Sequence, residues 1–241
     1  ALTGLKETME QIGPEQFSRY QGLLGLMRDT GYGWEQDNAN DRIVIFTERI
    51  ETMKWVRDHL RADLGLTAAQ VVSMDGSMTD MEQQGIVAAF AKEDSPIRVL
   101  VASDVASEGI NLHYRSHRLI HFDTPWSLMV FQQRNGRIDR FGQSEHPEIR
   151  FLTVEALNEK IKGDARILQI LIEKEKQASK NIGDPAMLMG KYSVDEETLA
   201  IQQVMERPGG ADELEDSLGA ASSSDLLEAM MALAQGKEIA G

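Results

Sequence analysis

Short runs of aliphatic and β-branched residues recur along the first two thirds of the chain, and segments of helical periodicity separate them. The runs have the length and composition of buried strands and fall at residues 43–46, 71–74, 99–103, 118–123 and 149–154. Between the first three runs, apolar residues recur at helical spacing in residues 50–64 and 81–90. Strands that alternate with helices indicate an α/β fold, in which helices cover both faces of a parallel sheet.

Helical patterns extend on both sides of this core. Residues 2–30 predict two short helices, interrupted at Gly13 and Pro14, and residues 31–40 form a polar connector. After Val154, a charged helix that runs to about Lys180 carries an apolar stripe made of Ile161, Ala165, Leu168, Leu171 and Ile172.

The last part of the chain is richer in acidic and small residues. A helix is expected over residues 196–205, followed by a flexible linker rich in Gly, Ser and acidic residues, and residues 226–233 form a last short helix or stay disordered. We therefore expect four parts: a helical lead-in and connector (1–40), an α/β lobe (41–155), a helical extension (156–193) and an acidic, partly flexible tail (194–241).

Two local signals predict where helices begin. Thr79 and Glu82 have the spacing of a capping box. Thr124, followed by Pro125, predicts a cap with proline in the first helical turn.

The composition narrows the class of protein. The chain has no cysteine, which excludes disulfide bonds and cysteine-based zinc sites and is typical of a reducing cytosol. No apolar run approaches the roughly 20 residues needed to cross a bilayer, and the first residues lack the order of a signal peptide. We expect a soluble, cytoplasmic protein with no membrane partner.

The formal net charge of −14 argues at first against a nucleic-acid partner. Its distribution weakens that argument, because residues 194–241 hold eleven acidic and only two basic residues. The tail therefore carries most of the imbalance, and the rest of the chain has room for a local basic groove.

Residues 132–143, QQRNGRIDRFGQ, place Arg134, Arg137 and Arg140 three residues apart. A guanidinium stays charged at physiological pH and matches phosphate oxygens two at a time. Residues three apart on a helix are neighbours, so Arg137 and Arg140 can point at one target. A solvated basic face of a surface helix is the alternative, and this segment alone does not decide between the two.

The segments around the arginines resemble a known motor. RIVIFTERIETMKWVRDHL (42–60), MDGSMTDMEQQGIVAAF (74–90), VLVASDVASEGINL (99–112) and the arginine segment resemble motifs IV, IVa, V and VI of the C-terminal lobe of superfamily 2 helicases and translocases. SEGINL, HFDTPW and QRNGRIDRFGQ are most similar to the Swi/Snf-type branch, in particular to its bacterial members related to an RNA-polymerase-associated translocase. The resemblance covers about half of the chain, residues 42–154.

This resemblance implies a RecA-like lobe of an ATP-dependent DNA helicase or translocase, with ATP and Mg²⁺ between two lobes. Arg137 and Arg140 are then the arginine fingers that stabilise charge on the γ-phosphate. Residues implied to face the nucleotide are Gln133, Asp104, Glu108 and Gly109, and those implied to contact nucleic acid are Thr47, Gly76, Ser77 and Ser103.

Plainer readings of these residues stay open. Arg134 is expected to bond within the lobe or to the partner lobe, with Asp123 or Asp139 as structural ion-pair partners. Ser103 and Asp104 can cap a helix, and the residues after the first two strands can form ordinary turns.

Histidines do not indicate a metal site. His113, His117 and His121 lie four residues apart, but residues 118–123 predict a strand, which breaks the helical geometry that such a site needs. We expect no metal bound by this chain.

The nucleotide-binding loop and acidic Mg²⁺ pair of such an ATPase are not recognised in the sequence. Residues 183–191, GDPAMLMGK, have six residues between their glycines instead of four, and Asp195 and Glu196 follow no buried strand. The chain is therefore expected to be half a motor and inactive alone, with an N-terminal RecA-like lobe of the same protein as the partner that binds ATP and Mg²⁺.

Two alternatives remain at this point. One is a RecA-like interaction module without motor activity, whose acidic tail recruits RNA polymerase or another protein. The other is a lobe of an RNA helicase. The sequence does not determine directionality, strand separation, the remodelled target or the oligomeric state.

Overall fold

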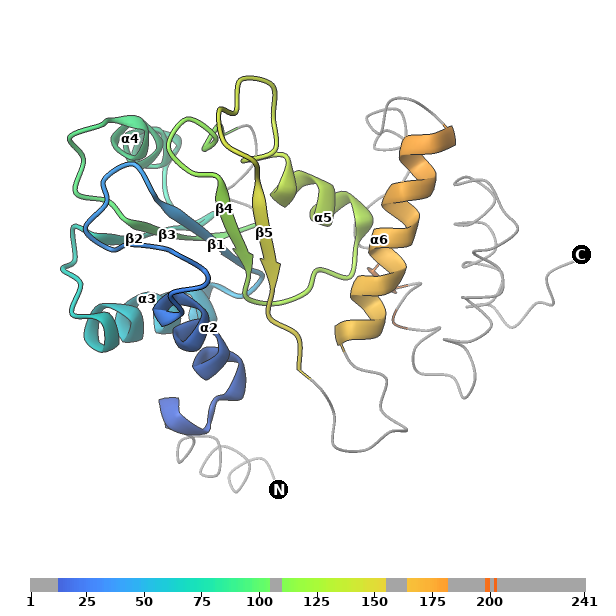
Figure 1. Ribbon diagram of the computed structural model, residues 1–241, viewed down its shortest axis with the longest axis horizontal. Coiled ribbons are helices and arrows are strands. Elements are labelled where there is room, and N and C mark those ends of the chain that lie inside the picture. Colours follow the sequence, from blue (N-terminus) through green and yellow to red (C-terminus); the bar gives the residue numbers. More distant parts are fainter. Residues whose placement is uncertain (1–12, 105–109, 155–163, 182–197, 200–201, 203–241) are drawn as a thin grey trace, which may run out of the picture. The chain divides into compact units, whose positions relative to one another are not determined.

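The computed structural model describes residues 13–104, 110–154, 164–181, 198–199 and 202 (Figure 1). The chain divides into two compact units. The first contains residues 1–123 and 134–154, and the second contains residues 124–133 and 155–241.

A five-stranded parallel sheet forms the centre of the first unit. Its strands are β1 (Ile43–Thr47), β2 (Val71–Met74), β3 (Val99–Ser103), β4 (Arg118–His121) and β5 (Glu148–Phe151). They lie in the order β2-β3-β1-β4-β5, and every neighbouring pair is parallel. The expected α/β fold is confirmed.

The strands of the sheet are buried on both faces because successive side chains point to opposite sides. Ile43 and Ile45 of β1 pack with α2 (Ser18–Arg28) and α3 (Ile50–Leu64), while Val44 and Phe46 pack on the other side with Phe90 of α4 (Asp80–Ala91). Figure 1 shows α2 and α3 below the sheet and α4 above it. Both faces are covered by helices, as the alternating pattern predicts.

The helix boundaries follow local chemistry. Thr79 and Glu82 form the predicted capping box at the start of α4, where the Thr79 hydroxyl accepts a hydrogen bond from the Glu82 amide. The helix α3 ends at Gly65, whose φ of 65° is a left-handed conformation that glycine adopts without strain.

The lead-in packs into the same core as the sheet. Residues 13–16 form a cap and the short 3₁₀ helix η1 (Pro14–Gln16), and α2 follows with Tyr20, Leu23, Leu24 and Met27 buried. The Tyr20 hydroxyl donates a 2.6 Å hydrogen bond to Asp63 of α3. The predicted boundary at residue 40 therefore lies inside one compact unit.

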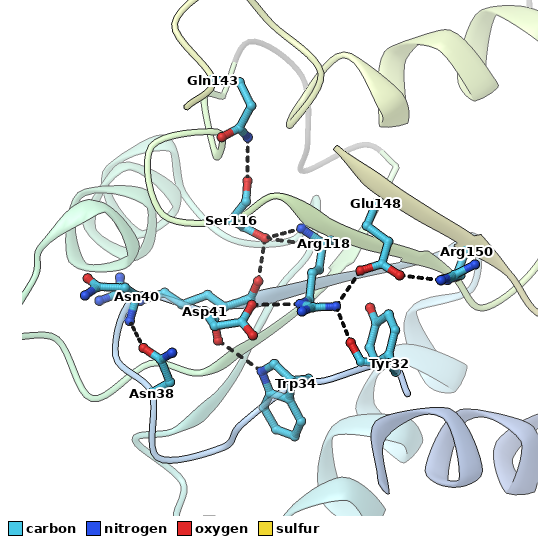
Figure 2. Close-up of polar contacts among 11 residues, drawn as sticks. Tyr32, Trp34, Asn38, Asn40, Asp41, Ser116, Arg118, Gln143, Glu148 and Arg150 are labelled. Carbon is cyan, nitrogen blue, oxygen red and sulfur yellow. Dashed lines mark hydrogen bonds and ion pairs between the residues drawn. The ribbon is translucent and has the colours of Figure 1, made fainter. Parts of the chain in front are cut away.

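The connector between α2 and β1 is polar in composition, but two of its aromatic side chains are buried. Tyr32 and Trp34 are 4% and 8% exposed, and the Trp34 indole donates a 3.0 Å hydrogen bond to the carbonyl of Asp41. Arg118 at the start of β4 pairs with Asp41 at 2.8 Å and donates to the Tyr32 carbonyl at 2.7 Å (Figure 2). These contacts bind the connector to the sheet at the amino ends of its strands.

Arg118 also pairs with Glu148 of β5, and its guanidinium lies over the Tyr32 ring, 4.6 Å from the centroid. Burial by itself lowers the pKa of Arg118, but the hydrogen bond and charge of Asp41 outweigh burial and raise it. The cation is thus retained inside the lobe by two carboxylates.

A second buried arginine closes the end of α4. Arg42 is fully buried, and its Nη2 donates to the carbonyl of Lys92 at 2.5 Å while Nη1 donates to the carbonyl of Phe90. These carbonyls belong to the last turn of a helix, where backbone acceptors lack partners and the dipole favours a cation. Burial, together with Arg98 and Arg115, lowers the pKa of Arg42 to about 10.

Several predicted boundaries are wrong. Strands β4 and β5 end at His121 and Phe151, two and three residues earlier than expected. The helix α5 (Leu128–Asn135) does not begin at Thr124, because Ser127 accepts a 3.3 Å hydrogen bond from the Val130 amide and caps it instead.

In the second unit, α6 (Asp164–Asn181) confirms the charged helix after Val154. Its buried face differs from the predicted stripe: Ile167, Ile170 and Leu171 are buried, whereas Ala165 is exposed. Residue 161, most of 196–205, and 226–233 lie outside the described residues. None of the described helices is both long and apolar enough to cross a membrane.

Candidate nucleotide and nucleic-acid site

The carboxyl ends of the strands are the natural ligand edge of this sheet. The chain leaves β1 toward β2 on one side, and it leaves β4 toward β5 on the other, although β1 and β4 are neighbours. In open α/β sheets, ligands bind outside the carboxyl ends of strands at such a switch point. Thr47, Ser103 and Asp123 lie at or just after the ends of β1, β3 and β4.

Arg134 organises this edge from within the lobe. Its side chain is 1% exposed and donates two hydrogen bonds to the Asp104 carboxylate, from Nε at 2.6 Å and from Nη2 at 2.8 Å. It also donates to the carbonyl of Asp123 at 2.9 Å and to its carboxylate at 3.1 Å. Burial alone lowers the pKa of Arg134, but its hydrogen bonds and charge interactions with Asp104 and Asp123 outweigh burial and raise it.

Arg134 therefore bonds within the lobe, and Asp123 is confirmed as one of its expected partners. The second carboxylate comes from Asp104 rather than Asp139. Asp104 follows β3, so this ion pair joins the segment after β3 to the start of the arginine segment. The role of Asp104 at the nucleotide stays a prediction.

Asp123 also holds the end of β1. Its Oδ2 accepts hydrogen bonds from the Thr47 hydroxyl at 2.5 Å and from the Glu48 amide at 2.9 Å. Thr47 is completely buried. The Thr47 hydroxyl thus connects the end of β1 to the segment that follows β4. Its expected contact with nucleic acid stays a prediction.

His121 and Asn135 support Arg134 from the other side. His121 Nδ1 lies 3.3 Å from Nη1 of Arg134, and Nε2 lies 2.9 Å from Oδ1 of Asn135. Because an arginine can only donate, Nδ1 must accept and the proton sits on Nε2. Burial and the charge of Arg134 lower the pKa of His121 to about 3, so the ring is neutral.

The other expected nucleic-acid residues lie along the same edge. Gly76 and Ser77 are exposed just after β2, and Ser103 ends β3 with 2% of its surface exposed. Ser77 is bonded within its own turn, because both its amide, at 2.8 Å, and its hydroxyl donate to Asp75. The hydrogen bond from the Ser77 hydroxyl is the main reason that the pKa of Asp75 is lowered. Within the described residues, the Ser103 hydroxyl is buried without a hydrogen-bond partner.

Arg137 and Arg140 are not on a helix, because α5 ends at Asn135 and turns follow. The prediction that helical spacing aligns them is therefore wrong. They converge by another route: Arg137 Nη1 donates to the Ile110 carbonyl at 3.4 Å, and Arg140 Nη1 donates to the side chain of Asn111. Both guanidinium groups thus reach the segment that follows β3.

For the remaining expected site residues, the described part of the structure gives no contact that bears on their predicted roles. Glu108 and Gly109 lie outside the described residues. Gln133 lies on α5 and belongs to the second unit, so its nucleotide contact stays a prediction. Among the described residues, no cluster of histidine and acidic side chains has the arrangement of a metal site.

Sequence reasoning missed part of the site. It did not identify His121 and Asn135 as partners of Arg134, and it did not see Asn111 beneath Arg140. One signal was available, since His121 is the first residue of the HFDTPW segment that carried the resemblance. The other pairs are made by sheet topology, which spacing in the sequence does not reveal.

Comparison with known proteins decides the family. The model described as "Helicase conserved C-terminal domain" matches residues 22–142, half of the chain. The chain belongs to this helicase family. The match begins inside α2, which agrees with the packing of α2 into the core of the helicase domain.

The chain is also similar in sequence to two named bacterial proteins. The RNA polymerase-associated protein RapA of Klebsiella pneumoniae is 30% identical over 165 residues, which cover 61% of this chain and 16% of that protein. RapA of Photobacterium profundum is 34% identical over 112 residues, which cover 46% of this chain and 11% of that protein. The helicase domain thus spans less than a fifth of these relatives.

A solved structure has the same fold. The crystal structure of the C-terminal part of the Fun30 ATPase domain aligns with a TM-score of 0.52 at 18% identity, covering 67% of this chain and 48% of that one. The resemblance to the C-terminal RecA-like lobe of Swi/Snf-type superfamily 2 proteins is confirmed.

Proposed function

We propose that this helicase domain is the C-terminal motor lobe of an ATP-dependent DNA translocase. Its part in ATP hydrolysis is to present Arg137 and Arg140 to a nucleotide held mainly by an N-terminal RecA-like lobe of the same protein. The proposal rests on the convergence of both arginines on residues 110–111, in the segment that follows β3.

The residues present fit a phosphate. Arg140 is exposed, and no carboxylate of the described residues forms an ion pair with it. Among the described residues, its side chain donates a hydrogen bond to Asn111, which directs the guanidinium while other donors of the fork stay available for a ligand. An exposed guanidinium whose direction is fixed by a neutral amide suits an anionic oxygen.

When bound, ATP supplies the phosphoryl group, and Mg²⁺, held mainly by the N-terminal lobe, neutralises charge on the phosphate oxygens. This chain's residues have two tasks. Arg137 and Arg140 donate hydrogen bonds where negative charge grows in the transition state. Arg134, with Asp104 and Asp123, holds the segment after β3 and the arginine segment in a fixed relation.

Nucleic acid is proposed to lie along the ends of β2, β3 and β1, which are neighbours in the sheet. Gly76, Ser77, Ser103 and Thr47 are the proposed contacts, and the proposed ligand is double-stranded DNA. Phosphate contacts of this kind fix position without reading sequence, as a translocase requires. Closing and opening of the two lobes during each hydrolysis cycle would step them along the DNA.

The proposal is tested by DNA-stimulated ATP hydrolysis in the intact protein. Arg137→Ala and Arg140→Ala are each expected to lower kcat by about 10³- to 10⁵-fold, with a smaller change in KM. The control is Arg150→Ala, a half-exposed arginine of β5 that pairs with Glu148. Unchanged kcat in both arginine variants would refute the motor role and favour an interaction module.

RNA polymerase is the proposed protein partner, because the two relatives are named as RNA polymerase-associated proteins. Co-purification of the intact protein with RNA polymerase tests this part of the proposal, and its loss on deletion of residues 194–241 would assign the contact to the acidic tail.

A further inference from the structure

Two aromatic side chains project into solvent close to Arg140. Phe141 is 101% exposed and Tyr114 is 64% exposed. Large apolar side chains of this kind, next to an arginine, are typical of the central residues of protein interfaces. Neither aromatic residue is used by the phosphate chemistry assigned to Arg137 and Arg140.

The turns that carry these side chains are held together from within. The Leu112 amide donates a 3.1 Å hydrogen bond to the carbonyl of Arg137. His113 is 4% exposed, and its ring contacts that of Tyr114 with 4.0 Å between centroids. A Cβ atom at Gly142, the residue after Phe141, would lie 3.6 Å from His113 Nε2. The Tyr114 and Phe141 turns thus rest on one buried histidine.

Gln143 fastens the Phe141 turn a second time. Its side-chain nitrogen donates to the carbonyl of Ser116 at 2.9 Å and to that of Ile138 at 3.1 Å. Gly142 has a φ of 95°, a left-handed conformation that lets the chain turn sharply after Phe141. The backbone of Phe141 therefore lies in a fixed turn, and this turn loses little conformational freedom when a partner binds.

The charge around the aromatic residues favours a protein partner over a nucleic acid. Exposed Asp139 and Glu145 flank Arg140 in the same segment, so the surface is not basic. Proteins that stack bases on aromatic rings combine them with a positively charged groove for the backbone. A mixed acidic, basic and aromatic surface instead fits another folded protein surface.

We infer that Phe141, supported by Tyr114, is the contact point at which the nucleotide-binding lobe of the same motor docks when the two lobes close. The inference rests on the proposed function, because Arg140 must reach a nucleotide held by that lobe and Phe141 is its chain neighbour. Docking on Phe141 brings Arg140 to the phosphate and excludes water from the cleft.

The test measures lobe closure in the intact protein by energy transfer between one dye on each lobe, with DNA and a non-hydrolysable ATP analogue. Phe141→Ala is expected to lower the ratio of closed to open protein about thirtyfold, the size of an interface hot spot. Tyr114→Ala lowers it less. Met81→Ala, which removes an 83% exposed side chain on α4, is the matched control and leaves the ratio unchanged.

Closure of Phe141→Ala equal to wild type overturns the inference. Normal closure of Phe141→Ala with a changed preference between ATP and GTP would also overturn it, because Phe141 would then be a base-stacking residue. Loss of DNA affinity alone, with normal closure, would overturn it too. The Arg137→Ala and Arg140→Ala variants distinguish failure of the docking inference from failure of the proposed function. If they lose hydrolysis while Phe141→Ala closes normally, only the docking inference fails. If they hydrolyse ATP normally, the proposed function fails as well.

Discussion

Arg134 and His121 are neighbours in the core whose charges are handled in opposite ways. Arg134 keeps its charge because Asp104 and Asp123 lie against it. His121 loses its charge because it is buried beside Arg134, with Nδ1 3.3 Å from the Arg134 Nη1. A second cation here would be repelled, so the neutral ring accepts from Arg134 and donates to Asn135. One protonation state of His121 therefore fits the lobe.

This state predicts how stability depends on pH. Between pH 6.5 and about 3, the unfolded chain binds a proton at His121 and the folded chain does not. The free energy of unfolding therefore falls as pH decreases through this window, by about 1 kcal/mol per pH unit from this group.

The measurement is urea unfolding of wild type and His121→Gln at several pH values from about 7 to about 4.5. The variant lacks the titrating group, so its slope with pH should be shallower by about 1 kcal/mol per unit. Since carboxylates contribute equally to both proteins, equal slopes would show that His121 is protonated in the folded state.

At the scale of elements, helix ends carry much of the polar chemistry. The capping box of Thr79 and Glu82 begins α4, and Arg42 ends it by donating to the carbonyls of Phe90 and Lys92. Arg42 lies immediately before β1, so this contact ties the far end of α4 to the central strand.

Replacement of Arg42 by Met tests this closure. Methionine fills similar space but leaves at least two carbonyls without a donor, so we expect a loss of about 3 kcal/mol in the free energy of unfolding. Arg150→Met, at a half-exposed side chain, should cost less than about 1 kcal/mol in the same urea unfolding experiment. Similar losses in both variants would contradict the capping role of Arg42.

The bounds of the strands and helices show which of them the apolar pattern of the sequence predicts correctly. Strands β1, β2 and β3 and helices α3 and α4 were predictable to within about a residue, because their apolar periodicity agrees with their caps. The start of α5 was not, since Ser127 caps it in place of Thr124. The end of α5 was also missed: Asn135 binds His121 and glycine follows it, so Arg137 falls in a turn.

At the scale of the whole molecule, the sequence identified the proposed phosphate-binding residues but not what holds them. The resemblance of residues 132–143 to motif VI marked Arg137 and Arg140 as a pair. Their contacts with residues 110–111 depend on the packing of two turns, which no local pattern encodes. The family match then places these residues in a helicase domain that spans less than a fifth of the matched RapA relatives.

The proposed DNA track crosses the ends of three neighbouring strands, so a charge placed there should act on DNA affinity. Gly76 is exposed after β2, and its φ is not positive, so a side chain there causes no left-handed backbone strain. Gly76→Glu in the intact protein should weaken DNA binding several-fold at about 50 mM salt, and less at about 200 mM.

Fluorescence anisotropy with labelled duplex DNA measures this effect. Gly85→Glu is the matched control, because Gly85 is exposed on α4 with open space around its Cβ position and is not one of the proposed DNA contacts. Equal affinities of the two glutamate variants would place the DNA elsewhere on the lobe.

In the proposed mechanism, this lobe stabilises the charge that develops on a nucleotide bound by the partner lobe. Single-turnover ATP hydrolysis by the intact protein, saturated with DNA, tests it most directly, with wild type compared to Arg140→Ala. In Arg140→Ala we expect normal ATP binding and a chemical step slower than in wild type by about 10³-fold or more. A chemical step at the wild-type rate would contradict it.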